Sequence, residues 1–391
     1  MALHMMHAVC KHFGSLARRR GLQQAGEVAV LSIGTVEQAL CAEALHTPGG
    51  FLWWYADLVS PEGDGVVLIW AFGLPFLPGR ESASRKGRGT PGRSQPSLAV
   101  SVYRAGKPVF YLLQEYDADD AEVDLESGRC RMGSSRFWSR VEGGRRVVSC
   151  ELDVQVPASP SLEGELHIEG AALRNPTAAL PAAGWHVWAP LTTATTGQAR
   201  LRLGGRPLCD VTGRAYHDSN GSVAPLSGLG IEEWAWGREA VGDHEEVHYV
   251  LWPEGGGRPE AHLLRLGADG DVQAEEAEVL SAPRRYGMWG LPWHRELRLR
   301  GVRTGRERVV QPGSVVDDGP FYLRSLLGTG TAEWVRPGRV DVGFLRPFID
   351  MCVHRPRGRN AWMLPFFSGE RATRWRRLVG SRRPVLTAAA P

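Results

Sequence analysis

The amino-acid sequence predicts an all-β protein built of sandwiches or barrels. From Phe51 onward, short runs alternate apolar and polar side chains with a period of two, as in FLWWYADLVS and GVVLIWAFGLPF. Gly, Pro, Asp or Ser bounds each run, as expected of strands joined by turns. Helical periodicity is scarce after residue 45, and repeated strands without helices are typical of sandwiches and barrels.

The length of the chain predicts two domains of comparable size. A single core rarely grows beyond ~250–300 residues, and this chain has 391. We expect a poorly ordered leader over residues 1–45, a first domain over 46–225 and a second over 226–391. The boundary falls where Pro225, Gly228 and Gly230 interrupt the strand pattern.

Composition and charge narrow the class of partner. Hydrophobic residues make up 43% and charged residues 23% of the chain, which is typical of a globular protein in water. A formal net charge of only +3 argues against a nucleic-acid partner. Residues 79–97 contain almost no apolar side chain and several cations, which predicts a solvated loop or, alternatively, a lid or a basic loop that contacts anionic lipid headgroups.

The cysteines and the apolar segments favour a cytoplasmic location. Six cysteines lie far apart without a CxxC pair, so we expect free thiols in a reducing compartment. The first residues lack the apolar core of a secretory signal, and no stretch approaches the ~20 apolar residues of a spanning helix. Peripheral contact with the inner membrane stays open.

One segment matches a metal motif. His244 to His248 reads HEEVH, the H-E-x-x-H pattern of zinc proteases, which requires a helix. The following residues alternate as a strand does, and residues four apart on a strand are separated by about 13 Å. We therefore expect no zinc site there. The sequence also lacks dinucleotide, phosphate-loop and nucleophile-elbow motifs, so no metal or cofactor is expected.

Two polar clusters stand among strand-like flanks: WHVWAP at 185–190 and AYHDSN at 215–220. Alternate residues of a strand share a face, so His186 and Trp188 point one way, as do Tyr216 and Asp218. If the intervening hairpins bring these strands together, the four side chains form one site. Alternatively, His186 and Asp218 form a satisfied buried pair that holds two strands in register, with Trp188 and Tyr216 as core.

At these clusters the chain resembles the carotenoid 1,2-hydratases, also called hydroxyneurosporene synthases. The resemblance runs in the family's order over residues 51–367, through FLWWYADLVSPEGDGVV, SLAVSVYRAGKPVFYLLQEY, WHVWAP, GRAYHDSN, IEEWAWGRE, GPFYLRSLL and AWMLPFF. Ala215 replaces the second glycine of the family's Gly-x-Gly-Tyr segment. The resemblance implies two lipocalin-like β-domains packed together.

The resemblance also implies catalytic roles for His186, Trp188, Tyr216 and Asp218. Substrate contacts are expected from the aromatic residues of the two tryptophan-rich strands: Trp53, Trp54, Tyr55, Trp234 and Trp236. Hydration of an unactivated alkene begins with a proton on carbon, and an apolar site keeps a carboxyl such as Asp218 protonated. Faces of Trp188 and Tyr216 can stabilise the cation by roughly 1–2 kcal/mol each. His186 then orients Asp218 or returns its proton.

The implied function is cofactor-independent hydration of a terminal isoprenoid double bond of an acyclic carotenoid. The substrate would be an apolar polyene. One alternative is that the same acid starts a cyclisation, or that the pocket folds a substrate for a pericyclic step. Another is a lipocalin-like lipid carrier without catalysis, which predicts a permanent His186–Asp218 ion pair.

Overall fold

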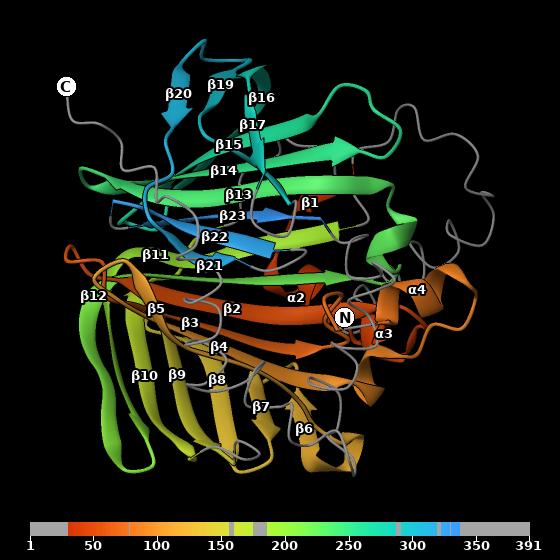
Figure 1. Cartoon of the computed structure of the whole chain (residues 1–391), viewed down its shortest axis with the longest axis vertical. Coiled ribbons are helices and arrows are strands. Elements are labelled where there is room, and N and C mark those ends of the chain that lie inside the picture. The colour runs from red at the N-terminus through yellow and green to blue at the C-terminus, as the bar shows by residue number, and fades with distance from the viewer. Residues whose placement is uncertain are drawn as a thin grey trace.

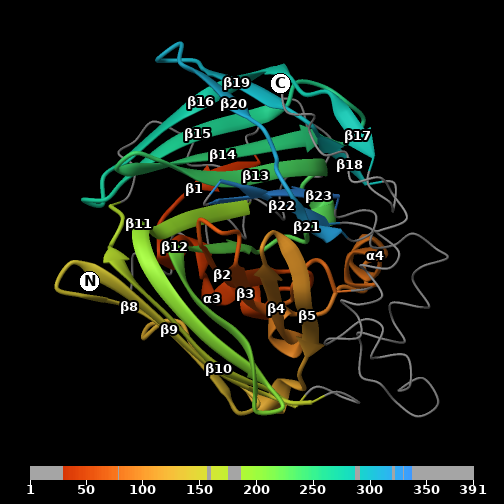
Figure 2. The same cartoon turned by 60° about the vertical axis from the view of Figure 1, so that its left-hand side comes forward.

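The computed structural model describes residues 30–77, 79–155, 160–174, 186–286, 291–318, 322–328 and 330–336. These residues form two curled sheets that face each other, with a small two-stranded sheet beside them (Figures 1 and 2). Neighbouring strands are antiparallel, except that β1 runs parallel to β11. The predicted all-β class is confirmed.

In the described part of the chain, the larger sheet has 12 strands in the order β5-β4-β3-β2-β12-β11-β10-β9-β8-β7-β6, with β1 beside β11. Its strands are β1 (Leu31–Ile33), β2 (Phe51–Val59), β3 (Gly65–Phe72), β4 (Pro96–Arg104), β5 (Lys107–Glu115), β6 (Ala121–Asp124), β7 (Arg129–Met132), β8 (Ser135–Glu142), β9 (Arg145–Val154), β10 (Leu162–Ala171), β11 (His186–Leu203) and β12 (Arg206–Ser222). The longest hairpin, β11–β12, lies at its centre.

The second sheet has 9 strands among the described residues, in the order β20-β19-β16-β15-β14-β13-β23-β22-β21. They are β13 (Ile231–Val241), β14 (His244–Pro253), β15 (Glu260–Gly267), β16 (Val272–Ser281), β19 (Leu297–Gly301), β20 (Glu307–Val310), β21 (Val315–Asp318), β22 (Tyr322–Leu327) and β23 (Gly330–Val335). Strands β17 (Arg284–Tyr286) and β18 (Pro292–His294) pair with each other.

Short helices occupy the connections: α2 (Val36–Ala39), α3 (Ala42–His46), α4 (Arg80–Arg85), and the 3₁₀ helices η1 (Gly92–Ser94), η2 (Ala118–Asp120) and η3 (Leu226–Gly228). Residues 30–45 are ordered as β1, α2 and most of α3, which corrects the predicted leader for that part; residues 1–29 lie outside the described residues. Strand β1 and these helices are too short to show a hydrophobic periodicity in the sequence. Parallel pairing with β11 positions β1.

The first residues of the 79–97 segment pack against the body of the protein, whereas its later cations are exposed, so only part of the segment is the solvated loop that the sequence predicts. In α4, a guanidinium nitrogen of Arg80 donates to the carbonyl oxygen of Gly50 at 2.6 Å, and Glu81 accepts from the backbone N–H of Ser227 at 2.6 Å. Both side chains are buried. Arg80 and Glu81 are thus paired with backbone groups of distant segments, while the cations that follow them stay exposed.

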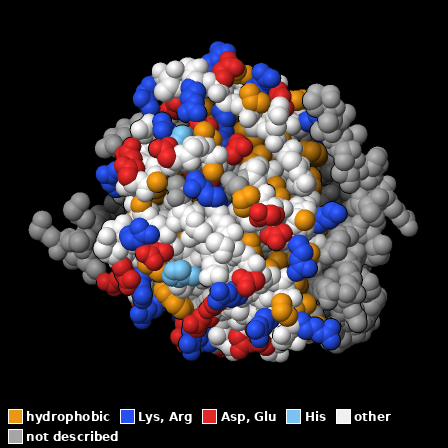
Figure 3. Space-filling view, turned by 90° about the vertical axis from the view of Figure 1, so that its left-hand side faces the viewer, with side chains coloured by type: hydrophobic (Ala, Val, Ile, Leu, Met, Phe, Trp, Pro, Cys, Tyr) orange, Lys and Arg blue, Asp and Glu red, His pale blue; other side chains and the backbone are white. Residues whose placement is uncertain are grey.

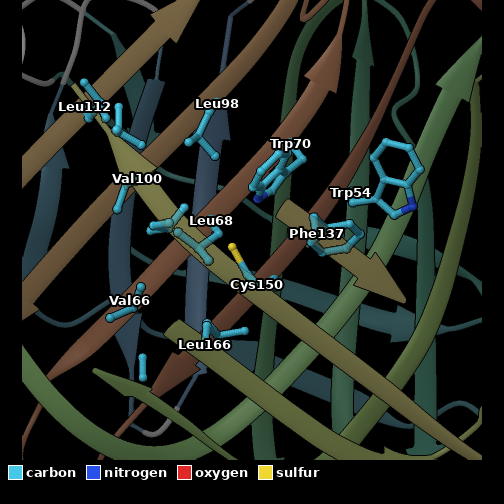
Figure 4. Close-up of a cluster of buried hydrophobic side chains, with 14 of the residues drawn as sticks. Trp54, Val66, Leu68, Trp70, Leu98, Val100, Leu112, Phe137, Cys150 and Leu166 are labelled. Carbon is cyan, nitrogen blue, oxygen red and sulfur yellow. The ribbon is translucent and has the colours of Figure 1, made fainter. Parts of the chain in front are cut away.

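Strand alternation divides the apolar side chains between separate cores. Within the curl of the larger sheet, Trp54, Trp70, Phe137 and Cys150 pack together (Figure 4). A second core lies between the two sheets and is rich in aromatic rings from β2, β11 and β12 on one side and β13 and β14 on the other. The predicted polar clusters lie in this second core.

Cysteine pairing differs from expectation at one position. Cys130, Cys150 and Cys209 are free thiols, as predicted, whereas Cys41 is disulfide-bonded. Its spacing from the other cysteines gave no signal of a bond. Among the described residues, no helix is long and apolar enough to cross a bilayer.

Candidate active site

The site is built on three neighbouring strands of the larger sheet. In the β11–β12 ladder, Trp188 lies opposite Asn220, and Pro190 lies opposite Asp218. On the other side of β12, strand β2 places Tyr55 opposite Asp218. Alternation turns every second side chain of β12 toward the second sheet, so Asp218 points into the aromatic core between the sheets.

Three donors converge on the carboxyl group of Asp218, which is only 3% exposed. The indole Nε1 of Trp188 donates to Oδ2 at 2.8 Å, and the hydroxyl of Tyr216 donates to the same oxygen at 2.9 Å. The amide Nδ2 of Asn220 donates to Oδ1 at 3.0 Å. The hairpin thus brings Trp188, Tyr216 and Asp218 into direct contact.

Burial raises the pKa of Asp218 to about 8. The hydrogen bonds from Trp188 and Tyr216 lower this pKa but do not offset the burial, and the nearby carboxylates of Glu333 and Asp57 raise it further. Because an ionised carboxyl is costly in a dry apolar site, Asp218 is mostly protonated at pH 7. It is an acid with a proton available at neutral pH.

His186 reaches Asp218 through Asn220 and not directly. Its Nε2 lies 3.0 Å from the amide Oδ1 of Asn220. Burial lowers the pKa of His186 to about 4, so the imidazole is neutral. Its Nδ1 is buried without a hydrogen-bond partner among the described residues.

Asn220 is a site residue that the sequence analysis did not single out. The available signal was its position two residues after Asp218, which puts both side chains on one face of β12. The sequence pattern predicts a direct contact between His186 and Asp218, but in the structure the amide of Asn220 lies between them.

Aromatic rings surround these groups. The rings of Trp53, Trp234 and Tyr249 lie 5.8, 6.3 and 6.0 Å from the imidazole of His186, measured between centroids. On the other side, the ring of Trp236 lies 5.3 Å from that of Tyr216 and 5.4 Å from that of Tyr55. Four of the five expected substrate-contacting aromatics therefore line the core between the sheets.

Trp54 is the exception. It points to the opposite face of β2, into the core of the larger sheet, and its ring lies 5.6 Å from that of Phe137 (Figure 4). Since adjacent residues of a strand face opposite sides, Trp54 cannot share a surface with Trp53 and Tyr55. The structure therefore does not bring Trp54 together with the other aromatic residues expected to contact substrate.

Tyr249 was also missed by the sequence analysis. Its ring lies 5.3 Å from that of Trp188, edge to face, and burial raises its pKa well above the usual range. It belongs to β14, where it alternates with His248. The alternating residues of HEEVHYVLW predict a strand that contains Tyr249. Only the contact between the two sheets shows that this strand covers the site.

The H-E-x-x-H segment lies on β14, as the strand prediction required. Glu245 of this segment forms an ion pair, in which its carboxylate accepts a hydrogen bond from Arg238 Nη1 at 2.6 Å. Arg238 also donates through Nε to Asp57 Oδ1 at 2.9 Å. Asp57 in turn accepts from the hydroxyl of Tyr55 at 2.8 Å. This buried network joins β2 to β13 and β14 beneath the aromatic rings.

His217, between Tyr216 and Asp218, lies on the far face of β12. Its Nδ1 lies 2.8 Å from the carbonyl oxygen of Tyr55, and its Nε2 lies 2.9 Å from Ser139 Oγ. Burial lowers its pKa to about 3. The side chain is a satisfied core histidine and is not part of the site.

The fold and the site together define a two-sheet β-protein with a buried carboxylic acid among aromatic rings. Residues 88–336 match the family model of the carotenoid hydratase CrtC, and the chain belongs to this family. This agrees with the resemblance noted in the sequence.

Relatives support the same family. The chain is 28% identical over 294 residues to the acyclic carotenoid 1,2-hydratase of Thiocapsa roseopersicina, covering 73% of this chain and 66% of the relative. It is 27% identical over 300 residues to that of Rubrivivax gelatinosus, covering 72% and 66%. The chain thus spans just under two thirds of the length of these relatives.

A solved structure shares the fold. A crystal structure from Nitrosomonas europaea, named for AttH, aligns with a TM-score of 0.50 at 13% identity and covers 73% of this chain and 92% of its own. The lipocalin-like architecture expected from the sequence agrees with this likeness.

Proposed function

We propose that this protein adds water to the terminal C1–C2 double bond of an acyclic carotenoid. The observation that carries the proposal is the protonated, buried carboxyl of Asp218 between aromatic rings. The family and the names of the two relatives supply the substrate class. An apolar polyene suits a site walled by Trp53, Trp234 and Trp236.

Asp218 starts the reaction by giving its proton to C2, which leaves a tertiary cation at C1. The donors from Trp188, Tyr216 and Asn220 already point at the carboxyl oxygens, so they stabilise the carboxylate that forms without any rearrangement. Nearby ring faces stabilise the cation. A water molecule then adds to C1 and loses a proton, giving a tertiary alcohol.

The geometry disfavours a carrier without catalysis. That hypothesis predicts a permanent ion pair between His186 and Asp218. Instead, burial moves the two pKa values in opposite directions, which leaves both groups neutral at pH 7, and Asn220 separates them. A neutral acid supports chemistry in which a proton is transferred.

Membrane contact follows from the substrate, because such polyenes dissolve in the bilayer. Charged side chains of both signs are interspersed on the face that Figure 3 shows, so we do not assign the membrane contact to that face. We place it at the exposed cations that follow the start of α4: Arg85, Lys86, Arg88 and Arg93. Replacing Lys86, Arg88 and Arg93 with Glu should abolish co-sedimentation with anionic vesicles; retained binding would exclude this surface.

The proposed activity is tested by incubating purified protein with detergent-dispersed lycopene or neurosporene. We expect a product heavier by one water from the wild-type protein and none from Asp218→Asn, which keeps the shape but has no acidic proton. Ser219→Ala serves as the matched control, because that side chain lies on the other face of β12. No change in mass would refute hydration of these substrates, and an isomer of unchanged mass would indicate cyclisation.

A further inference from the structure

Hydrogen bonds connect Trp188, Asp218, Asn220 and His186 in that order. Trp188, at one end, fixes which group donates and which accepts. An indole N–H can only donate, so Oδ2 of Asp218 must accept from Trp188. The hydroxyl of Tyr216 takes the second lone pair of Oδ2. With Oδ2 accepting from both Trp188 and Tyr216, we assign the proton of neutral Asp218 to Oδ1.

The direction is passed on by Asn220. Its Nδ2 donates to Oδ1 of Asp218, which leaves the amide oxygen facing His186. An amide oxygen can only accept, so Nε2 of His186 must carry the hydrogen. A neutral imidazole has one N–H, and the lone pair is then on Nδ1, the buried nitrogen without a partner among the described residues.

We propose that Asn220 is a positioning residue that separates acid from base: it holds the reactive proton of Asp218 on Oδ1 and makes Nδ1 of His186 the acceptor for a proton of the attacking water. This inference rests on the proposed hydration. Oδ1 of Asp218 gives the proton to the alkene, and Nδ1 of His186 takes the proton from water. The amide of Asn220 fixes the roles of both atoms.

The proton balance closes. The Oδ1–H bond breaks as the alkene π electrons form the C2–H bond, and water oxygen bonds to C1 while its proton passes to Nδ1. Asp218 is then a carboxylate and His186 an imidazolium. Because the pKa of His186 is lowered to about 4 and that of Asp218 is raised to about 8, the proton returns downhill through water, and both groups are reset.

The first test measures the tautomer of His186 and needs no substrate. Long-range ¹H–¹⁵N spectra of the full-length, histidine-labelled protein at pH 7 are expected to show hydrogen on Nε2, with the signal assigned by its loss in His186→Gln. Hydrogen on Nδ1 in the wild-type protein would overturn the proposal.

Asp218→Asn makes the test sharper. In this variant, the carbonyl oxygen of the new amide must still face the donors Trp188 and Tyr216, so the NH₂ group of the new amide faces Asn220. The amide of Asn220 must then turn so that its oxygen accepts from this NH₂ group. The NH₂ of Asn220 then faces His186, and the hydrogen must move to Nδ1. We expect this tautomer switch in Asp218→Asn and not in Ser219→Ala; an unchanged tautomer in Asp218→Asn would contradict the proposed direction.

Kinetics supply a second, separate readout. Asn220→Ala should lower kcat by roughly tenfold to hundredfold with little change in KM, since a misplaced catalytic group costs rate and not substrate binding. Asn220→Asp should also move the alkaline limb of the pH profile upward, because a second carboxylate raises the pKa of Asp218. Unchanged kcat in Asn220→Ala would refute the positioning role.

The two proposals fail in different ways. Predicted tautomers without any hydrated product would support the fixed direction of the hydrogen bonds and refute the proposed function. Hydrated product with the opposite tautomers would support the function and refute the role of Asn220. If Asn220→Ala does not fold, the tautomer switch in Asp218→Asn still decides.

Discussion

At the residue scale, one carboxyl group is kept protonated by its surroundings. Asp218 accepts three hydrogen bonds, each of which favours the ionised form, yet burial dominates and raises its pKa to about 8. This combination makes Asp218 an acid at neutral pH whose conjugate base is already solvated by fixed donors.

The pKa of Asp218 predicts how stability depends on pH. The folded value of about 8 is above the ordinary value of 3.8, so the folded chain binds the extra proton between those values, and stability falls as pH rises through that window. The side chain in Asp218→Asn does not titrate, so the stability of this variant does not fall through the same pH window. We expect the variant to match the wild-type protein near pH 4 and to gain up to about 1.4 kcal/mol per pKa unit by pH 8; parallel curves in urea unfolding would contradict this.

Tyr216→Phe tests the donors. Hydration requires protonated Asp218, so kcat should fall at alkaline pH with a midpoint near 8. Removing the hydroxyl removes one bond that favours the carboxylate, worth about 1.5 kcal/mol or more, so the midpoint should rise by about one pH unit. An unshifted or lowered midpoint in the pH profile would exclude this hydrogen bond as a determinant of acidity.

At the element scale, buried charges join strands of different sheets. Asp57 of β2 and Glu245 of β14 pair with Arg238 of β13, and all three side chains are fully buried. Thr331 of β23 also donates to Asp57, at 3.0 Å. The network sets the distance between the sheets directly beneath Tyr55 and the acid site.

Asp57→Asn should therefore be strongly destabilising. A buried Arg238 that loses one of its two anionic partners costs about 3–5 kcal/mol. The matched control is Glu169→Gln, which breaks an exposed pair with Arg145 at 2.6 Å and should cost less than about 1 kcal/mol. Equal losses in urea unfolding of the two variants would show that the buried network contributes no more than a surface pair.

At the scale of the whole molecule, each sheet covers the aromatic face of the other. Trp236 of the second sheet packs on Tyr55 and Tyr216 of the first, and Tyr249 packs on Trp188. The domain boundary near residue 225 stays a prediction, but a chain ending there would expose this apolar face to water.

We accordingly expect residues 1–225 alone not to form a stable unit. The exposed aromatic face should bind the dye ANS, and the near-UV circular dichroism of the tryptophans should weaken, as in states that lose specific packing. The intact chain should unfold in one transition. A soluble fragment with cooperative unfolding and no dye binding would show that the first sheet is stable by itself.

The sequence predicted the features that depend on neighbouring residues. Period-two runs identified the strands, including β14 despite its H-E-x-x-H segment, and alternation placed Trp188 with His186 and Tyr216 with Asp218 on shared faces. The resemblance to carotenoid hydratases added the order of the blocks and the catalytic set. The alternation of side chains along β2 also places Trp54 on the face opposite to Trp53 and Tyr55, although the family motif groups the three residues together.

What only the tertiary structure decided depends on contacts between distant strands. Strand period fixes the face of a side chain but not the register of β11 against β12, so the amide of Asn220 between His186 and Asp218 was not visible in the sequence. The proton on Asp218 depends on burial beneath the second sheet, where Trp236 and Tyr249 pack against Tyr216 and Trp188. Local sequence determined which groups face the core, and the packing of the two sheets determined their acidity.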